Sequence, residues 1–377
     1  MATQASFPYP PGLYDPAIGE KSLKASLAHA QMADELGFDW VSVSEHHYGP
    51  GIMTPNALVW AGALTQVVKR AKIALLGPIV SINNPVRLAE EIALLDLMSG
   101  GRIIAFMLRG TPNEFNTYYV NASETRERSQ EAIKLMERAW TEPQPFGWEG
   151  RYFRYPTVAV WPRPTQVPHP PILSSGNSPE SCVFAAKNHH GLAISFIPPE
   201  LVVKSVELYK EEAAKAGWQP SEEHIVYRSI INIVEREEDL KPQGQMRAGR
   251  PRPRPEYNSA PRGFGALSWL ETAQEPKQET SGGGRRYDPN EDGAARGGEG
   301  FGLGSLQFQG TPDQIVEKIK AFHDVTGVGV LDLLFMNTGG PEATAKRLRL
   351  FAEEVLPEIR DLQKKDTSVS STANALA

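Results

Sequence analysis

Three titratable side chains, Glu45, His46 and His47, follow one another at the end of an apolar stretch. The preceding residues 40–43, WVSV, predict a buried strand, and a loop rich in Gly and Pro follows the two histidines. The ends of strands are where α/β enzymes hold their chemistry. Imidazole changes charge near neutral pH, so it can hold, donate or accept a proton. We therefore predict that these three residues are catalytic; the alternative is that they only anchor the loop by hydrogen bonds.

Other polar groups lie where later strands are expected to end. Asn83 and Asn84 follow one strand, Arg109 and Gly110 follow the next, and residues 174–178, SSGNS, follow a third. The last segment leads into a helix, where free N–H groups and the helix dipole favour a phosphate. Ser178 and Ser181 can add hydroxyl donors, and Arg109 can add positive charge. The alternative for residues 174–178 is an ordinary helix cap.

Strand and helix patterns alternate along the chain, which predicts a parallel sheet in an α/β fold. The count is one strand short of a (β/α)8 TIM barrel, so the first strand is weak, at residues 6–9, or missing. A doubly wound open sheet is the alternative. The apolar runs that predict strands are residues 40–45, 72–80, 102–108, 171–175, 192–197, 224–234 and 330–336.

The sequence predicts one domain over residues 1–362 with two additions. Residues 152–161 predict a small β-hairpin outside the main sheet, and residues 241–305 form a long loop rich in Gly, Pro and Arg. A loop of this length is either a lid over the site or a disordered insertion. A nucleic-acid-binding arm is a weaker alternative because Asp and Glu are interleaved with the arginines. Residues 363–377 predict a disordered tail.

Composition narrows the class of protein. The chain has 377 residues, 40% hydrophobic and 22% charged, as in a globular protein. Its net charge of −6 gives no reason to expect nucleic acid or a membrane as partner. The single cysteine, Cys182, excludes an internal disulfide and a multi-cysteine metal site, and we predict no metal ligands. With neither a signal peptide nor an apolar run long enough to span a bilayer, a cytoplasmic protein is expected.

Several segments in a fixed order resemble the bacterial-luciferase-like family of flavin-dependent monooxygenases, in particular its limonene and alkanal monooxygenase branch. The resemblance covers residues 14–197 and 310–356. It implies a TIM barrel that binds reduced FMN at the C-terminal ends of the strands. The segments that carry it are ADELGFDWVSVSEHH (33–47), NPVRLAEEIALLDLMSGGRI (84–103), RGTPNEF (109–115), SSGNSPESCVFAA (174–186) and GTPDQIVEKI (310–319).

The resemblance also assigns roles to individual residues. His46 matches the active-site histidine beside the reactive edge of the flavin, with Glu45 or His47 setting its tautomer. Asn84 lies where family members touch the isoalloxazine. Arg109, followed by Gly110, matches the phosphate-binding arginine. The phosphate loop and the helix start that follows it are matched by Ser175, Gly176, Asn177, Ser178 and Ser181.

The implied activity is that of a two-component oxidoreductase. Reduced FMN (FMNH2) and O2 would oxygenate a small organic substrate through a flavin hydroperoxide. No glycine-rich nucleotide fingerprint occurs between a strand and a helix, so reduced flavin is expected from a separate NAD(P)H:flavin reductase. The resemblance further implies a homodimer. Two alternatives stay open: a flavin- or deazaflavin-dependent reductase or dehydrogenase on the same fold, and a non-catalytic flavin-binding paralogue.

Overall fold

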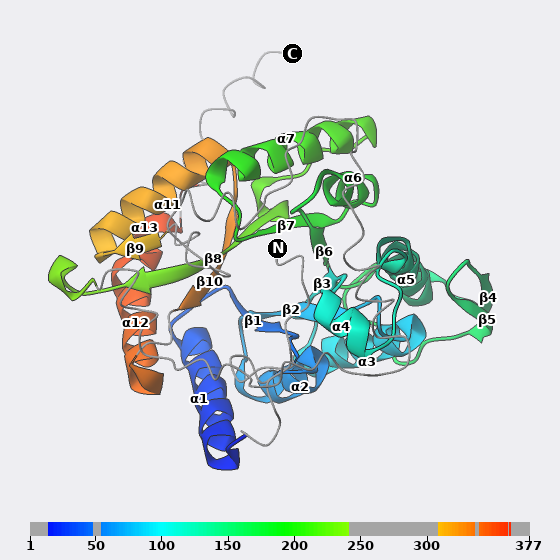
Figure 1. Cartoon of the computed structure of the whole chain (residues 1–377), viewed down its shortest axis with the longest axis horizontal. Helices are drawn as coiled ribbons and strands as arrows, with labels where there is room; N and C mark the ends of the chain where they lie inside the picture. Colours follow the sequence, from blue (N-terminus) through cyan, green and yellow to red (C-terminus); the bar gives the residue numbers. More distant parts are fainter. Residues whose placement is uncertain (1–13, 48–53, 241–307, 336–338, 361, 363–377) are drawn as a thin grey trace, which may run out of the picture. The chain divides into compact units, whose positions relative to one another are not determined.

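The computed structural model describes residues 14–47, 54–240, 308–335, 339–360 and 362, which form two compact units (Figure 1). The first contains the described residues up to Asp34 and the described part of Asp39–Ile172. The second contains Glu35–Phe38 and the described residues from Leu173 onward. The candidate first strand at residues 6–9, the insertion at 241–305 and the tail at 363–377 lie outside the described residues. One domain over residues 1–362 stays a prediction.

Three parallel strands form the sheet of the first unit, in the order β1-β2-β3. Helices α2 and α3 pack against each other and against strands of this sheet, and α5 packs against α3 (Figure 1). Apart from Lys72, every residue of β2 is buried, as expected of a strand covered on both faces. The elements are α1 (Pro16–Glu35, its last residue in the second unit), β1 (Trp40–Ser44), α2 (Ala57–Val67), β2 (Lys72–Ile79), α3 (Pro85–Ser99), β3 (Ile103–Leu108), α4 (Pro112–Thr117) and α5 (Thr125–Thr141).

A two-stranded antiparallel hairpin, β4 (Phe146–Glu149) and β5 (Arg154–Val158), follows α5. The Glu131 carboxylate on α5 holds its turn, accepting the backbone N–H groups of Arg151, Tyr152 and Phe153 at 3.0 Å each. The predicted hairpin outside the main sheet is confirmed, but it begins at Phe146 and not at residue 152. The first strand of the hairpin was not predicted, because the pairing register of the two strands shifts and this disturbs the alternation of polar and apolar residues.

Four parallel strands form the sheet of the second unit in the order β6-β7-β8-β10, and the short strand β9 also pairs with β8. Helices α7 and α11 lie side by side over this sheet (Figure 1). The elements are β6 (Ile172–Ser175, its first residue in the first unit), α6 (Pro179–Lys187), β7 (Gly191–Ser195), α7 (Pro199–Lys215), two 3-10 turns (Glu222–His224 and Glu237–Asp239), β8 (Ile225–Ile233), β9 (Phe308–Gly310), α11 (Pro312–Thr326), β10 (Val330–Phe335), α12 (Gly340–Glu354) and α13 (Leu356–Ile359).

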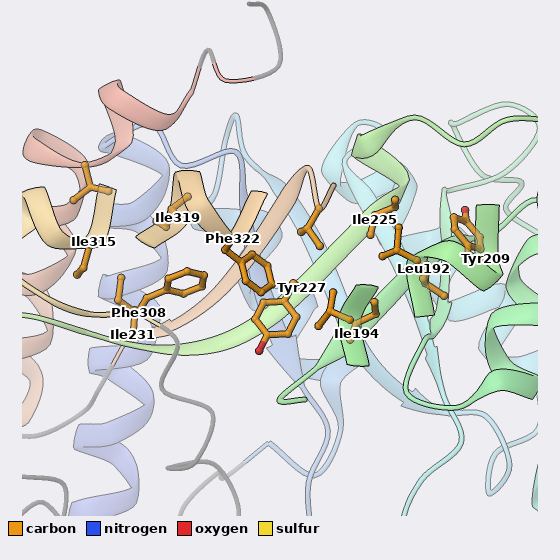
Figure 2. Close-up of a cluster of buried hydrophobic side chains, with 14 of the residues drawn as sticks. Leu192, Ile194, Tyr209, Ile225, Tyr227, Ile231, Phe308, Ile315, Ile319 and Phe322 are labelled. Carbon is orange, nitrogen blue, oxygen red and sulfur yellow. The ribbon is translucent and has the colours of Figure 1, made fainter. Parts of the chain in front are cut away.

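The two faces of β8 differ in character. Tyr227, Ile231 and Ile233 point into a core cluster shared with α11, and Figure 2 shows Tyr227 beside Phe322 and Ile231 beside Phe308. The opposite face alternates with it and includes Arg228 and Asn232, both buried. This second face is therefore polar in part, whereas the interiors of parallel barrels usually hold branched apolar side chains.

The strand order supports the predicted barrel architecture. Within each unit, strands that follow one another in the chain are neighbours in the sheet, with helices between them. A doubly wound sheet contains a point where the strand order reverses, and neither unit has one among its described strands. All seven predicted strands are present. The three-residue strand β9 was not predicted, because a run of that length has no usable periodicity.

Buried carboxylates fix the loops that feed the strands of the first unit. Asp34, at the end of α1, accepts the backbone N–H groups of Lys69, Arg70 and Ala71 at 2.7–2.9 Å, just before β2. Asp96, on α3, accepts those of Thr165 and Gln166 at 2.8 and 2.9 Å, in the segment before β6. Each carboxylate thereby accepts hydrogen bonds from backbone N–H groups of a loop, which the sheet itself cannot pair.

We predict that Asp34→Asn lowers the free energy of unfolding at pH 7 by about 1–3 kcal/mol, because an amide cannot accept all three N–H groups. Burial opposes ionisation of Asp34, but the three backbone hydrogen bonds and Arg70 together lower its pKa. A lowered folded-state pKa stabilises the protein above the unfolded-state pKa, and this contribution disappears as pH falls through the folded-state value.

Urea unfolding of both proteins between pH 7 and pH 3 checks this, and the difference between them should shrink toward pH 3. Asp324→Asn, at an exposed carboxylate on α11, is the control and should leave stability nearly unchanged. A constant difference at every pH would contradict the assignment.

Candidate active site

The Glu45-His46-His47 segment is fixed at the C-terminal end of β1. The Glu45 N–H donates to the Leu76 carbonyl at 3.2 Å, which continues the pairing of β1 with β2. The His46 N–H donates to the Thr54 carbonyl at 3.2 Å, and the Thr54 hydroxyl donates to the Ser44 carbonyl at 2.6 Å. The predicted position at a strand end is therefore confirmed, and backbone hydrogen bonds hold the segment from both sides.

Glu45 and His47 form a buried pair. His47 Nε2 lies 3.3 Å from Glu45 Oε1, and each side chain is only 6% exposed. The His47 ring also meets the ring of Tyr118 edge to face, with centroids 5.5 Å apart. The Glu45 carboxyl thus pairs with His47, which itself contacts an aromatic residue that follows α4.

The surroundings of Glu45 favour its protonated form. Burial is the main cause of a raised pKa, and the nearby Glu114 carboxylate adds to it by repulsion. The hydrogen bond and charge of His47, together with the backbone N–H of Ile79, act in the opposite direction without cancelling the rise. A carboxyl group that keeps its proton to higher pH beside an imidazole can exchange a proton with it.

A glycine in β2 makes room for Glu45. Gly77 lies within a register shift between Leu76 and Ile79 and has φ +137°, a conformation that favours glycine. A Cβ atom on Gly77 would lie 2.7 Å from the Glu45 Cβ and 3.1 Å from the Glu45 N. The end of β1 therefore depends on the absence of a side chain at Gly77.

Asn84 and Arg109 lie beyond the ends of β2 and β3. The Asn84 side chain caps α3, accepting the N–H groups of Val86 and Arg87 at 3.0 and 3.2 Å. Asn84 is thus engaged in the cap that its position before Pro85 predicts. The Arg109 carbonyl accepts the Ser81 hydroxyl at 2.6 Å, while the side chain of Arg109 is exposed to solvent. The backbone of Arg109 is thus anchored while its side chain lies at the surface.

Gly110 is required by packing. Its φ is +96°, and an added Cβ would lie 2.7 Å from the Ile79 side chain and 3.0 Å from the Phe115 ring. Thr111 then starts α4 with a capping box, in which its N–H donates to Glu114 at 2.8 Å. Gly110 therefore sets the direction of the chain after Arg109.

In the second unit, the loop after β6 is closed by Asn177. Its side chain donates to the Ser195 carbonyl at 2.9 Å and accepts the Ser195 N–H at 2.8 Å. The Gly176 N–H donates to the Ala193 carbonyl at 2.7 Å, and a Cβ there would meet Leu192 and Ile194 at 2.8 Å. Both residues thus join the ends of β6 and β7, which accounts for their types without a ligand.

The start of α6 carries the predicted phosphate-binding hydroxyls. Ser178 is its N-cap, and the Ser178 and Ser181 hydroxyls lie 3.0 Å apart. Ser175 is half-buried at the end of β6. Cys182 is fully buried, and burial raises the pKa of its thiol to about 11, in agreement with the packing role its position indicates.

Each unit, taken by itself, contains groups whose chemistry suits a phosphate. In the first unit the Arg109 side chain is exposed, and in the second unit Ser178 and Ser181 place hydroxyl groups at the start of α6. Arginine, hydroxyl and helix N-terminal donors are the groups that bind phosphate monoesters. Within the described ranges, no cluster of three His, Cys, Asp or Glu side chains is placed to hold a metal ion.

Several contacts of the site escaped prediction. The contact of Gly77 with Glu45 and that of Tyr118 with His47 join residues far apart in sequence, and no local pattern signals them. The pairing of the His190 ring with the Ser174 hydroxyl at 2.9 Å likewise joins β6 to the residue that precedes β7, while the backbone N–H groups of His189 and His190 bond to the last carbonyls of α6.

The sequence matches the family described as luciferase-like monooxygenase over residues 5–328, and the chain belongs to that family. It is 23% identical to the alkanal monooxygenase alpha chain of Photobacterium leiognathi, covering 94% of this chain and 97% of that one. It is also 23% identical to the FMNH(2)-dependent dimethylsulfone monooxygenase of Pseudomonas putida, covering 91% and 90%. An uncharacterized Sinorhizobium fredii protein, y4wF, is 29% identical, but that match spans only 48% of this chain and 52% of y4wF.

Solved structures show the same fold. The monooxygenase RslO1 from Streptomyces bottropensis is 26% identical with a TM-score of 0.71, covering 93% of this chain and 97% of that one. The oxygenating constituent of 3,6-diketocamphane monooxygenase of Pseudomonas putida, solved with FMN, is 20% identical with a TM-score of 0.70, covering 95% and 99%. An F420-dependent secondary alcohol dehydrogenase is 20% identical with a TM-score of 0.66, covering 90% and 96%. The predicted TIM-barrel fold and the predicted class, a flavin-dependent monooxygenase, are confirmed.

We predict that Gly77→Ala destabilises the protein by about 1–3 kcal/mol, because the new Cβ overlaps Glu45 and φ +137° is unfavourable for alanine. Gly62→Ala in α2 is the matched control: its Cβ would have its nearest neighbour at 4.0 Å, and alanine favours a helix. Thermal unfolding of the two variants should change in opposite directions. Equal stability of Gly77→Ala and the unsubstituted protein would contradict the packing of Gly77 on Glu45.

Proposed function

We propose that the protein is the oxygenase component of a two-component, FMN-dependent monooxygenase that oxygenates a small organic substrate with O2. The observation that carries this proposal is the buried Glu45–His47 pair flanking His46 at the end of β1, in a chain of the luciferase-like monooxygenase family. An ionisable group held at a strand end of this fold is placed for chemistry.

Arg109 and the start of α6 are the proposed phosphate-binding groups. Arg109 supplies a charge that stays ionised at any working pH, and Ser178 and Ser181 supply hydroxyl donors. Ser175, Gly176 and Asn177 shape the loop between β6 and α6, and Gly110 directs the chain after Arg109. Asn84, which caps α3, is the proposed contact of the isoalloxazine. Reduced FMN, when bound, supplies the electrons that activate O2.

His46 is the proposed proton-transfer residue. Side chains alternate along an extended chain, so a segment that turns Glu45 and His47 toward each other turns His46 away from them. An imidazole at this position can take a proton from a substrate or donate one to a reduced oxygen. Glu45 and His47 hold the segment that presents it.

Reduced flavin is proposed to come from a separate NAD(P)H:flavin reductase. The sequence lacks a nucleotide-binding glycine motif between strand and helix. The structurally similar 3,6-diketocamphane enzyme is described as an oxygenating constituent, and the dimethylsulfone enzyme as FMNH(2)-dependent. A cytoplasmic location, where reductase and oxygenase could exchange flavin, stays a prediction. Among the described helices, none is both long and apolar enough to cross a bilayer.

A deazaflavin-dependent dehydrogenase is the second candidate function, because an F420-dependent alcohol dehydrogenase shares the fold. A test with reduced FMN, and separately with reduced F420, in the presence and absence of O2 separates the two functions. Product formation that needs O2 and FMN supports the oxygenase. A flavin-binding protein without turnover in either assay is the remaining alternative.

A homodimer is proposed from an apolar surface of the first unit. On α3, Leu94, Leu97 and Met98 are 47%, 54% and 45% exposed, and their spacing places them on one face. On the adjoining helix α2, Val59 is 75% exposed. Exposed apolar side chains gathered on packed helices are typical of a surface that a second chain covers.

We predict that His46→Ala lowers kcat by about 100-fold, the size expected for loss of one proton-transfer group, while FMN binding is retained. Fluorescence quenching measures FMN binding, and coupled assays with a reductase over aldehydes, ketones and sulfones measure turnover. His29→Ala, on α1, is the control and should retain full turnover. Normal turnover in His46→Ala would remove His46 from the mechanism.

We predict that Leu97→Glu converts the dimer to a monomer, because a charge in an apolar interface lacks a partner. Light scattering after size exclusion gives the mass of one chain or of two. Val325→Glu on α11, where Val325 is 65% exposed, is the control and should leave the mass unchanged. A monomeric unsubstituted protein at micromolar concentration would refute the dimer.

A further inference from the structure

The C-terminal end of β8 holds a buried carboxamide, that of Asn232, which is only 5% exposed. In the part of the chain that the structure describes, the side chain of Asn232 forms no hydrogen bond. Asn177 offers a direct comparison, since both polar atoms of its side chain bond to Ser195. The two residues have the same side chain but opposite hydrogen-bonding states.

A second carboxamide, that of Gln309, lies beside Asn232. The register of β8 with β9 pairs Asn232 with Gln309. Ile231 and Phe308, the residues immediately before them, both point into the core cluster toward α11 (Figure 2). Because side chains alternate along strands, Asn232 and Gln309 share the opposite face. Among the described residues, the Gln309 side chain also lacks a partner; only its backbone carbonyl accepts a hydrogen bond, from Lys318.

An unpaired buried carboxamide is unfavourable, since it has lost its hydrogen bonds to water and gained none from the protein. Such groups are rare in folded proteins and usually bind a water molecule or a ligand. Together with the half-buried Gln309 in register, Asn232 offers both N–H donors and carbonyl acceptors from neighbouring strands. This pair is therefore suited to bind a polar group that the described residues do not supply.

The surrounding face favours a neutral ligand. Further along the same face of β8, Ile230 is apolar and Arg228 is paired with Asp332 of β10 in a buried ion pair. The charge of Arg228 is thus compensated within the protein and does not select an anion. Carboxamides above an apolar residue bind the oxygen of a neutral organic molecule better than a carboxylate or a phosphate.

We propose that Asn232 and Gln309 form a subsite that hydrogen-bonds a carbonyl or hydroxyl oxygen of a neutral organic substrate. This deepens the proposed function and rests on it, because the oxygenase reaction is what makes such a molecule the substrate. The subsite lies wholly within the second unit, at the C-terminal end of a strand, where the ligands of α/β barrels bind.

The test observes Asn232 directly and needs neither flavin nor turnover. The full-length protein is labelled with [15N]asparagine, and the side-chain NH2 signal of Asn232 is assigned by its absence in Asn232→Leu. Cyclohexanone, cyclohexanol and cyclohexane are added in turn, followed by FMN alone. We expect the ketone and the alcohol to shift this signal and the hydrocarbon to leave it in place. In Asn232→Leu, ligand-observed NMR should show cyclohexanone binding about 5–10-fold weaker.

The stability of the Asn232→Leu variant in urea is a second test of the proposal. Leucine resembles asparagine in size and has no unpaired polar group, so Asn232→Leu should keep or raise the urea midpoint. Asn188→Leu is the control, because the Asn188 side chain donates to the Phe184 carbonyl at 2.7 Å and its loss should lower the midpoint. A lowered midpoint in Asn232→Leu comparable to that control would show that Asn232 serves internal structure, and would overturn the subsite.

Two further outcomes would also overturn it. One is an Asn232 signal that neither oxygen-containing probe moves, or that cyclohexane moves equally. The other is a shift caused by FMN and not by the ketone, which would assign the carboxamide to the cofactor. Failure of the oxygenase assays together with a ketone-specific shift would leave the subsite in place and reject the proposed function instead.

Discussion

Hydrogen bonding of the backbone where strands begin and end is the constraint on which the rest of this structure depends. A parallel sheet satisfies the N–H groups inside its strands but not those in the loops between strand and helix. This chain meets that need with side-chain acceptors: the buried Asp34 before β2 and Asp96 before β6, and the half-buried Glu131 at the hairpin and Asn177 between β6 and β7. Because each binds a segment distant in sequence, the loops that lead into β2 and β6, the hairpin turn and the loop after β6 are fixed in position.

The same principle explains why one carboxyl group differs from the others. Asp34 accepts three backbone N–H groups, and these with Arg70 outweigh burial and lower its pKa. Glu45 is also buried, but a single backbone N–H and His47 do not offset its desolvation and the repulsion from Glu114, so its pKa is raised. The number of donors around a carboxylate thus separates a structural anchor from a group able to hold a proton. That difference comes from tertiary contacts and is not encoded in residue type.

Much of the fold was predictable because it depends on local patterns. Continuous apolar runs gave all seven main strands, and caps such as Asn84-Pro85 and Thr311-Pro312 gave helix starts. What escaped prediction depends on pairs of residues remote in sequence. The three residues of β9 are defined only by their pairing with β8, and the role of Gly77 only by its contact with Glu45. For the candidate site, the sequence located the strand ends, but not which side chains are already engaged in hydrogen bonds.

Whether a polar side chain is already hydrogen-bonded within the protein separates residues that hold the fold from residues that can bind a ligand. Asn84 and Asn177 match a family motif, yet their side chains also serve a helix cap and a loop closure. Asn232 belongs to no recognisable motif, yet it is buried, and among the described residues its side chain has no hydrogen-bond partner. A buried polar group without a hydrogen bond destabilises the folded protein. A group of this kind that is nevertheless present is therefore expected to bind a ligand. The sequence motifs therefore indicate the fold of this protein. Buried polar side chains without hydrogen bonds indicate where a substrate binds.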